Sequence, residues 1–154
     1  MTDLDAIYSN RILELAAAIP RSERLGNPDA SATAHSKLCG STVQVDLTMD
    51  GGVVTGYGQT VKACLLGQAA ASVVGREIVG TPKKEMAEVA AKMRAMLKEN
   101  GPPPGGRWAD LAVLEPVRDY KARHTSTLLV FDAVLDAMAQ IDAKRQHAAS
   151  SEPA

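Results

Sequence analysis

The spacing of the apolar residues changes at Thr42, and this change limits the folds open to the chain. From this point apolar and polar residues alternate, which predicts a half-buried β-strand. The Asp-Gly-Gly sequence at 50–52 is a turn signal, and residues 53–60 are expected to return as the partner strand. Gly56 and Gly58 indicate a bulge or a close approach of another backbone segment. The spacing after this hairpin is helical, so the chain combines a small sheet with helices.

The segment before the hairpin predicts one helix followed by irregular structure. Apolar residues recur there every three to four positions, which is typical of an amphipathic helix, and Pro20 ends it. The apolar positions are Leu4, Tyr8, Ile12, Leu15, Ala16 and Ile19. Residues 21–41 contain Gly26-Asn27-Pro28 and a run of small residues, so we interpret them as an irregular polar segment.

Three further helices are expected after the hairpin. The first begins near Cys64 and runs toward Ile78, and the second follows a Thr81 N-cap and Pro82. A loop at 100–106 and a short helical turn within 107–119 precede the last helix. The residues expected on buried faces are Met86, Val89, Met93, Met96 and Leu97 in the second helix, and Leu128, Phe131, Leu135, Met138 and Ile141 in the last.

These elements predict an α+β fold of two layers, in which a small antiparallel sheet of about three strands packs against several helices. The chain has 154 residues, which suits a single domain. We expect this domain to span residues 1–146 and a disordered tail to occupy residues 147–154. Aromatic residues make up only 3% of the chain, so the core must consist mainly of Ala, Val, Leu, Ile and Met.

The charge and hydropathy of the chain exclude two classes of partner. Seventeen basic and eighteen acidic side chains leave a net charge of -1, and no basic block is present to bind nucleic acid. No segment is apolar over the length of a membrane span. The N-terminus is acidic, unlike a signal peptide, so a cytoplasmic protein is expected. Its thiols are then reduced and available as nucleophiles or metal ligands.

Cys39 and Cys64 are the two cysteines of the chain, and they flank the predicted hairpin. An antiparallel hairpin brings its outer ends together, so we expect the two residues to lie near each other. Cys64 also stands at a predicted helix start with Lys62 two residues away, and both features lower the pKa of a thiol. The alternative interpretation is that both cysteines are small buried apolar residues.

His124 stands at the entry to the last predicted helix and is the third candidate site residue. A histidine in this position is more often simply exposed, and the hydroxyl residues after it are natural N-caps. His35 and His147 have no better claim to a function. The chain contains no Gly-rich phosphate loop, no nucleophile elbow and no CxxC sequence.

The order and spacing of these motifs resemble the family of iron–sulfur cluster assembly scaffolds that includes IscU, the N-terminal domain of NifU and SufU. The similarity covers roughly residues 24–142. It implies that Cys39 and Cys64 correspond to the first two cluster cysteines and that His124 precedes the third. The small residues after Cys64, namely Gly67, Ala69, Ala70, Ala71 and Ser72, match the family's helix start, and Gly26-Asn27-Pro28 matches its upstream Asn-Pro segment.

The chain departs from this family at two positions. Ser41 stands where the family has an aspartate that keeps the cluster labile, and Thr125 falls on the position of the third cysteine. A threonine hydroxyl is a hard, protonated ligand and does not replace a thiolate toward iron and sulfide. Cys39, Cys64 and His124 would supply three of the four ligands that a [2Fe–2S] cluster needs. A small thiol or a homodimer that shares one cluster would complete the set, and a zinc ion would face the same shortage.

The resemblance implies a metal-binding scaffold or carrier for an iron–sulfur cluster or iron, rather than an enzyme acting on a small substrate. Its expected partners are a cysteine desulfurase that supplies sulfur and apo-proteins that accept the cluster. Two alternatives stay open at this point. One is a zinc-dependent sulfur-transfer protein, and the other is a non-catalytic adaptor that retains the scaffold fold. If the chain accepts sulfur, Cys64 is the expected acceptor because a helix start favours its thiolate.

Overall fold

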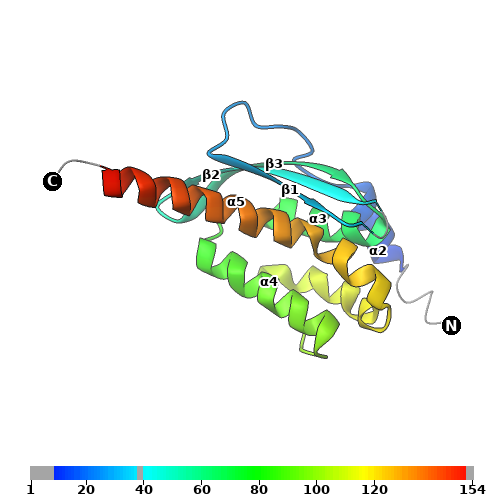
Figure 1. Ribbon diagram of the computed structural model, residues 1–154. Coiled ribbons are helices and arrows are strands. Elements are labelled where there is room, and N and C mark those ends of the chain that lie inside the picture. Colours follow the sequence, from blue (N-terminus) through cyan, green and yellow to red (C-terminus); the bar gives the residue numbers. More distant parts are fainter. Residues whose placement is uncertain (1–8, 38–39, 152–154) are drawn as a thin grey trace.

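The computed structural model describes residues 9–37 and 40–151 and contains a three-stranded antiparallel sheet covered by helices (Figure 1). In chain order the elements are α2 (Asn10–Ala17), β1 (Ala30–His35), β2 (Thr42–Asp50), β3 (Val53–Lys62), α3 (Leu65–Glu77), α4 (Lys83–Lys98), the 3-10 helices η1 (Gly106–Asp119) and η2 (Lys121–Arg123), and α5 (His124–Ser151). The predicted α+β class is therefore confirmed, with a sheet on one side and helices on the other.

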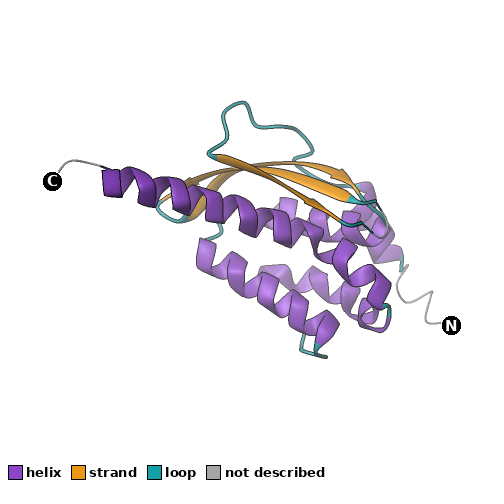
Figure 2. Ribbon diagram, in the orientation of Figure 1, coloured by secondary structure: helices purple, strands orange, loops and turns teal. Residues whose placement is uncertain are grey.

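The helices pack against one face of the sheet, whose strand order is β1-β2-β3 (Figure 2). The long helix α5 packs against β1 and β2, and α3 packs against both α5 and β3. On the other side, α4 packs against α5, and η1 packs against α3 and α4. The starts of α3 and α5 meet inside this arrangement, and that contact positions the candidate site.

The β2–β3 hairpin forms as the sequence predicts. Val43, Val45, Leu47 and Met49 are buried, and Gly51 and Gly52 adopt positive φ angles of 59° and 80° in the turn. The pairing register shifts between Thr48 and Met49, opposite Gly56. A Cβ atom on Gly58 would lie 2.1 Å from the carbonyl oxygen of Glu23. The predicted bulge and close backbone approach are both present.

The close approach comes from the segment between α2 and β1, which crosses the sheet on the face away from the helices (Figure 1). Asp46 is fully buried beneath it and accepts hydrogen bonds from Arg24, Ser31 and the Leu25 amide. Burial alone would raise the pKa of Asp46, but these hydrogen bonds hold it below its ordinary value. The buried carboxylate therefore fixes this segment on the sheet.

The sequence interpretation of residues 21–41 as irregular is wrong for Ala30–His35, which forms the edge strand β1. This strand pairs along β2 from Ala30 opposite Leu47 to His35 opposite Thr42. Its inward side chains are alanines, which give little apolar contrast to the polar residues between them. The free edge of β2 supplies the hydrogen-bonding partners, so tertiary pairing outweighs the weak local preference.

The predicted helices are present where the structure describes them, with local differences, and Leu4 and Tyr8 of the predicted N-terminal helix lie outside the described residues. The predicted N-cap Thr81 is wrong, because its hydroxyl donates to the carbonyl of Glu77 and Pro82 caps α4 instead. The short turn expected within 107–119 is a longer 3-10 segment, η1. In α5, Leu135 of the predicted face is only partly buried, whereas Leu129, Val130 and Val134 are buried as well, since the helix is covered on several sides.

The helix α5 continues as far as Ser151, beyond the start of the tail expected at 147. The described helices include none with the length and apolarity needed to cross a membrane.

Candidate functional site

The candidate site lies where β2 begins and β3 ends. Thr42 is paired with Lys62 at this end of the sheet, and the chain turns from β3 into α3 two residues later. Cys64 is the N-cap residue of α3, with φ -65° and ψ 169°, and its thiol is free and half-buried. No side-chain hydrogen bond caps this helix, so the amides of its first turn have no side-chain acceptor from the N-cap residue. The predicted helix start at Cys64 is confirmed.

Ser126 is the neighbour of Cys64 from α5. The Cys64 Sγ atom lies 3.5 Å from the Ser126 Oγ atom and donates a weak hydrogen bond to it. Ser126 Oγ in turn donates to the carbonyl of Arg123, at 3.2 Å. Ser126 is buried, whereas Thr125 is exposed. The hydroxyl beside Cys64 therefore belongs to Ser126, although the family resemblance aligned Thr125 with the third cluster cysteine.

Small residues in α3 make this contact geometrically feasible. A Cβ atom on Gly67 would lie 2.9 Å from the backbone oxygen of Ser126 and 2.9 Å from the Cβ atom of Ala63. Real Cβ atoms do not approach a backbone oxygen so closely without displacement of one segment. Gly67 thus lets the start of α3 lie directly against the start of α5, which explains the small-residue run seen in the sequence.

Cys39 lies outside the described residues, so its predicted proximity to Cys64 stays a prediction. The residues around it belong to the connection between β1 and β2. The Ser36 amide donates to the carbonyl of Ser41, the Gly40 amide donates to the carbonyl of Ser36, and both distances are 2.9 Å. Gly40 has a positive φ of 72°. This connection starts and ends beside the pair formed by Thr42 and Lys62, at the same end of the sheet as Cys64.

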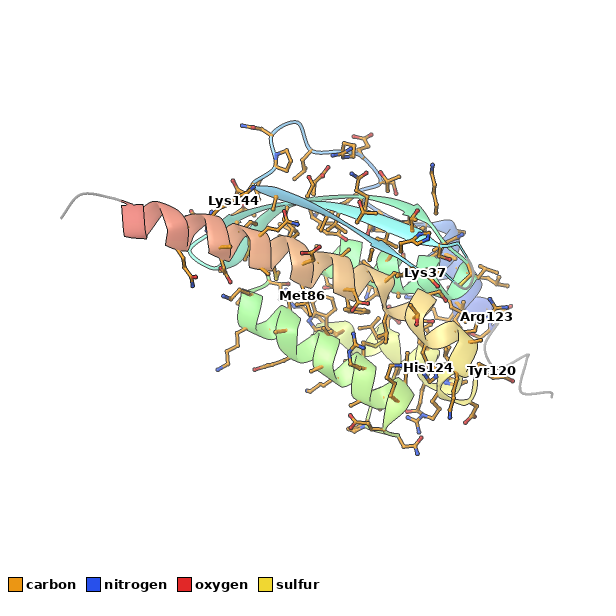
Figure 3. All side chains as sticks on the ribbon, viewed as in Figure 1. Lys37, Met86, Tyr120, Arg123, His124 and Lys144 are labelled. Atoms are coloured by element: carbon orange, nitrogen blue, oxygen red, sulfur yellow. The ribbon has the colours of Figure 1, made fainter. Side chains whose placement is uncertain are left out.

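His124 is buried and turned toward η1. Its Nε2 atom lies 3.1 Å from the carbonyl oxygens of Val117 and Arg118, an arrangement that suits a proton on this nitrogen. Its ring also lines a cavity beside Leu97 at the end of α4. Figure 3 labels His124 on the α4 side of the chain and Lys37 at the sheet. Among the described contacts of His124, none is with Cys64; Ser126 makes that contact instead.

His35 and Ser41 were also considered as candidate site residues. His35 is exposed at the end of β1, opposite Thr42. Ser41, at the position of the family aspartate, is buried. The sequence did not single out Ser126, because only the helical phase of α5 shows which of two adjacent hydroxyl residues faces α3.

Three described segments at this end of the sheet carry lysine or arginine side chains and no carboxylates. Lys37 lies in the β1–β2 connection, Lys62 ends β3, and Arg123 precedes α5. The described residues 35–37, 40–42, 61–65 and 121–127 contain no Asp or Glu. Within the described part of the chain, no three His, Cys, Asp or Glu side chains are grouped closely enough to hold a metal ion. A complete ligand set therefore needs groups beyond this part.

Comparison with known structures assigns the fold. A crystal structure of a nitrogen-fixing NifU-like protein (N-terminal) from Brucella abortus is 55% identical, with a TM-score of 0.92 over 93% of this chain and 99% of that one. A candidate iron–sulfur cluster assembly scaffold protein for the SUF system, SufU from Fervidobacterium islandicum, shares the fold at 20% identity, with a TM-score of 0.79 over 86% of this chain and 97% of that one.

A third structure, of a hypothetical protein, has a TM-score of 0.77 at 16% identity, over 88% of this chain and 98% of that one. No protein-family model and no curated protein matched the chain. At 55% identity over nearly the whole of both chains, the Brucella abortus protein is a close relative in sequence as well as in structure. This chain belongs to the NifU-like N-terminal family.

Proposed function

We propose that this protein is an iron–sulfur cluster assembly scaffold or carrier whose cargo is held by Cys64 together with Cys39. The observation that carries the proposal is the position of Cys64. Cys64 is the N-cap residue of α3 with a half-buried thiol, and the described segments at this end of the sheet contain Lys and Arg but no Asp or Glu, in the fold of the NifU-like family. Family membership supports the cargo, since the SufU relative is described as an assembly scaffold.

The electrostatics of the site favour such a cargo. Thiolate ligands and sulfide give an iron–sulfur cluster a negative charge. A persulfide on a cysteine is negatively charged as well. Lys62 lies two residues before Cys64 in the chain. Arg123 is linked to Cys64 through Ser126, whose hydroxyl contacts the Cys64 sulfur and donates to the Arg123 carbonyl. The uncapped amides of α3 add a further positive potential. These positive groups suit a negatively charged cargo at this end of the sheet.

The ligand set that we propose consists of Cys39 and Cys64, with His124 as a third donor. Binding through Nε2 would require His124 to leave the carbonyls of Val117 and Arg118. Ser126 Oγ is placed to donate a hydrogen bond to the Cys64 sulfur once the thiol is ionised, in exchange for its bond to the Arg123 carbonyl. The fourth ligand would come from a small thiol or from a second chain in a homodimer.

The partners follow from this role. A cysteine desulfurase would supply sulfur, and apo-proteins that need a cluster would receive it. The protein itself would act as a carrier and not turn over a small substrate. Since Cys64 is both accessible and next to positive charges, it is the residue that we assign as sulfur acceptor.

Anaerobic reconstitution with ferrous iron and sulfide tests the proposal, with visible absorbance and bound iron as readouts. We expect a cluster signal in the unchanged protein and its loss in Cys64→Ser and Cys39→Ser, and a reduced signal in His124→Ala. His35→Ala, an exposed histidine at the same sheet end, is the matched control and should keep the signal. If the unchanged protein binds no cluster under any condition, the proposal is wrong.

If no cluster binds, the metal content of the protein would distinguish a zinc-dependent sulfur-transfer protein from a non-catalytic adaptor. A colourless protein with one equivalent of zinc that depends on Cys64 would indicate sulfur transfer. A colourless, metal-free protein whose stability is unaffected by both cysteine substitutions would indicate an adaptor.

A further inference from the structure

The cavity lined by His124 lies between the end of α4, the two 3-10 helices and the start of α5. Its volume is about 340 Å³. The residues that line it are Leu97, Lys98, Asn100, Arg118, Lys121 and His124. Three of them are cations and none is acidic. Such a concentration of positive charge in a concave site favours an anionic ligand, because low-dielectric walls focus the potential.

Arg118 is the best-held cation of this cavity and still has an unused donor. One of its terminal nitrogens, Nη2, donates to the Gly101 carbonyl at 3.1 Å and lies 3.5 Å from a Glu115 carboxylate oxygen. Its Nε atom is buried and has no hydrogen-bond partner among the described residues. An unpaired N–H of a charged group is costly, so a ligand that moves the guanidinium slightly and accepts from Nε would recover this free energy.

Two nearby carboxylates, Asp132 and Glu115, offset part of the positive charge of the cavity. Asp132 is bound to Arg94 at 2.8 Å and also interacts electrostatically with Lys98. Glu115 contacts only the guanidinium of Arg118, at a distance longer than a good ion pair. Lys98 and Lys121 still bring two further positive charges to the cavity wall.

The size of the cavity leaves room for a ligand larger than a bare ion. A volume of about 340 Å³ lies at the lower end of the range for small-molecule sites. The buried Leu97 side chain and the His124 ring provide an apolar and planar part of the wall beside the cations. A ligand that fills this space therefore has a small organic body in addition to its negative charges.

We propose that this cavity binds a small organic anion with at least two negative charges, a phosphate monoester or a polycarboxylate. The lining residues do not include Cys64, although His124 belongs both to this cavity and to the proposed cluster ligands. The proposal does not depend on cluster binding, and Cys64→Ser should bind the anion as the unchanged protein does.

Isothermal titration with citrate, glycerol 3-phosphate and inorganic phosphate, all at one ionic strength, tests the proposal. We expect saturable binding of citrate or glycerol 3-phosphate, and the stronger of the two identifies the ligand class. Lys121→Ala should weaken this binding about tenfold, the loss of roughly one charge contact. Lys84→Ala, which removes an exposed lysine elsewhere on α4, is the control and should leave the affinity unchanged.

Histidine NMR signals locate the ligand. The resonances of His124 should shift on titration, while those of the exposed His35 should not. Arg118→Gln should also weaken binding, and thermal unfolding of this variant checks that it folds. The proposal is overturned if no organic anion binds saturably at millimolar concentration, or if Lys84→Ala weakens binding as much as Lys121→Ala does.

Discussion

The Cys64 Sγ atom lies 3.5 Å from the Ser126 Oγ atom, across the contact between the starts of α3 and α5. A thiol at position 126 would therefore face Cys64 directly. We predict that Ser126→Cys lengthens the lifetime of a reconstituted cluster by at least about tenfold, the scale on which even supporting contacts change metal affinity. The decay of visible absorbance under a chelator, measured anaerobically with a reductant present, gives this lifetime.

Thr125→Cys is the matched control for this substitution. It adds the same thiol one residue earlier, on an exposed position of the same helix turn. Cluster lifetime should stay at the level of the unchanged protein. If Thr125→Cys prolongs the lifetime and Ser126→Cys does not, then the sequence assignment of the third position is right and the structural one is wrong.

Gly67→Ala should disturb the same contact from the side of α3. Its new methyl group would lie 2.9 Å from the Ser126 backbone oxygen, so the two helix starts must separate. We expect a loss of about 1–3 kcal/mol in the free energy of unfolding, as for other overpacked sites, and weaker cluster retention. Urea unfolding measures the first effect. Gly26→Ala, where nothing lies within 4 Å of the added Cβ atom, should be close to neutral in both assays.

Gly58→Ala tests the crossing of the N-terminal segment over the sheet. The added methyl group would meet the Glu23 carbonyl oxygen at 2.1 Å, and both partners belong to the backbone. The expected loss of stability is about 3 kcal/mol or more, since no flexible side chain can move away. Thermal unfolding measures this loss. The control is Gly105→Ala, whose new Cβ atom would have no neighbour within 4 Å and which should keep the unfolding temperature of the unchanged protein. Equal unfolding temperatures for the two variants would contradict the close approach.

Asp46 should make stability depend on acidic pH. Although burial opposes ionisation, hydrogen bonds from Arg24, Ser31 and Leu25 hold its folded pKa below the ordinary value of about 3.9. The stabilisation is thus complete above the unfolded pKa and is lost as the pH falls through the folded one. Asp46→Asn should cost about 1–3 kcal/mol at neutral pH, because buried donors lose a charged acceptor.

The difference between the unchanged protein and Asp46→Asn should shrink when urea unfolding is repeated at decreasing pH below about 4. Asp136→Asn removes an exposed carboxylate and controls for the change in net charge. A difference that stays constant down to strongly acidic pH would show that the carboxylate charge of Asp46 does not contribute.

Much of the fold follows from local patterns. The alternation from Val43 to Met49 identified β2, the Gly51-Gly52 turn set the hairpin, and the apolar spacing around Met86 and Met93 identified α4. These signals are strong because each element buries one regular face. The edge strand Ala30–His35 was missed, since alanine gives weak contrast and its partners come from β2.

The sequence by itself determined the fold class, the helix start at Cys64 and the lysine two residues before it, because these depend on residue type and spacing along the chain. Only the tertiary structure decided which residues meet. Packing of α3 on α5 places Ser126 beside Cys64. His124 instead lies against the carbonyl oxygens of Val117 and Arg118 in η1. Adjacent residues on a helix point in directions about 100° apart, so helix phase and packing, which spacing alone does not fix, select the side chain that reaches the site.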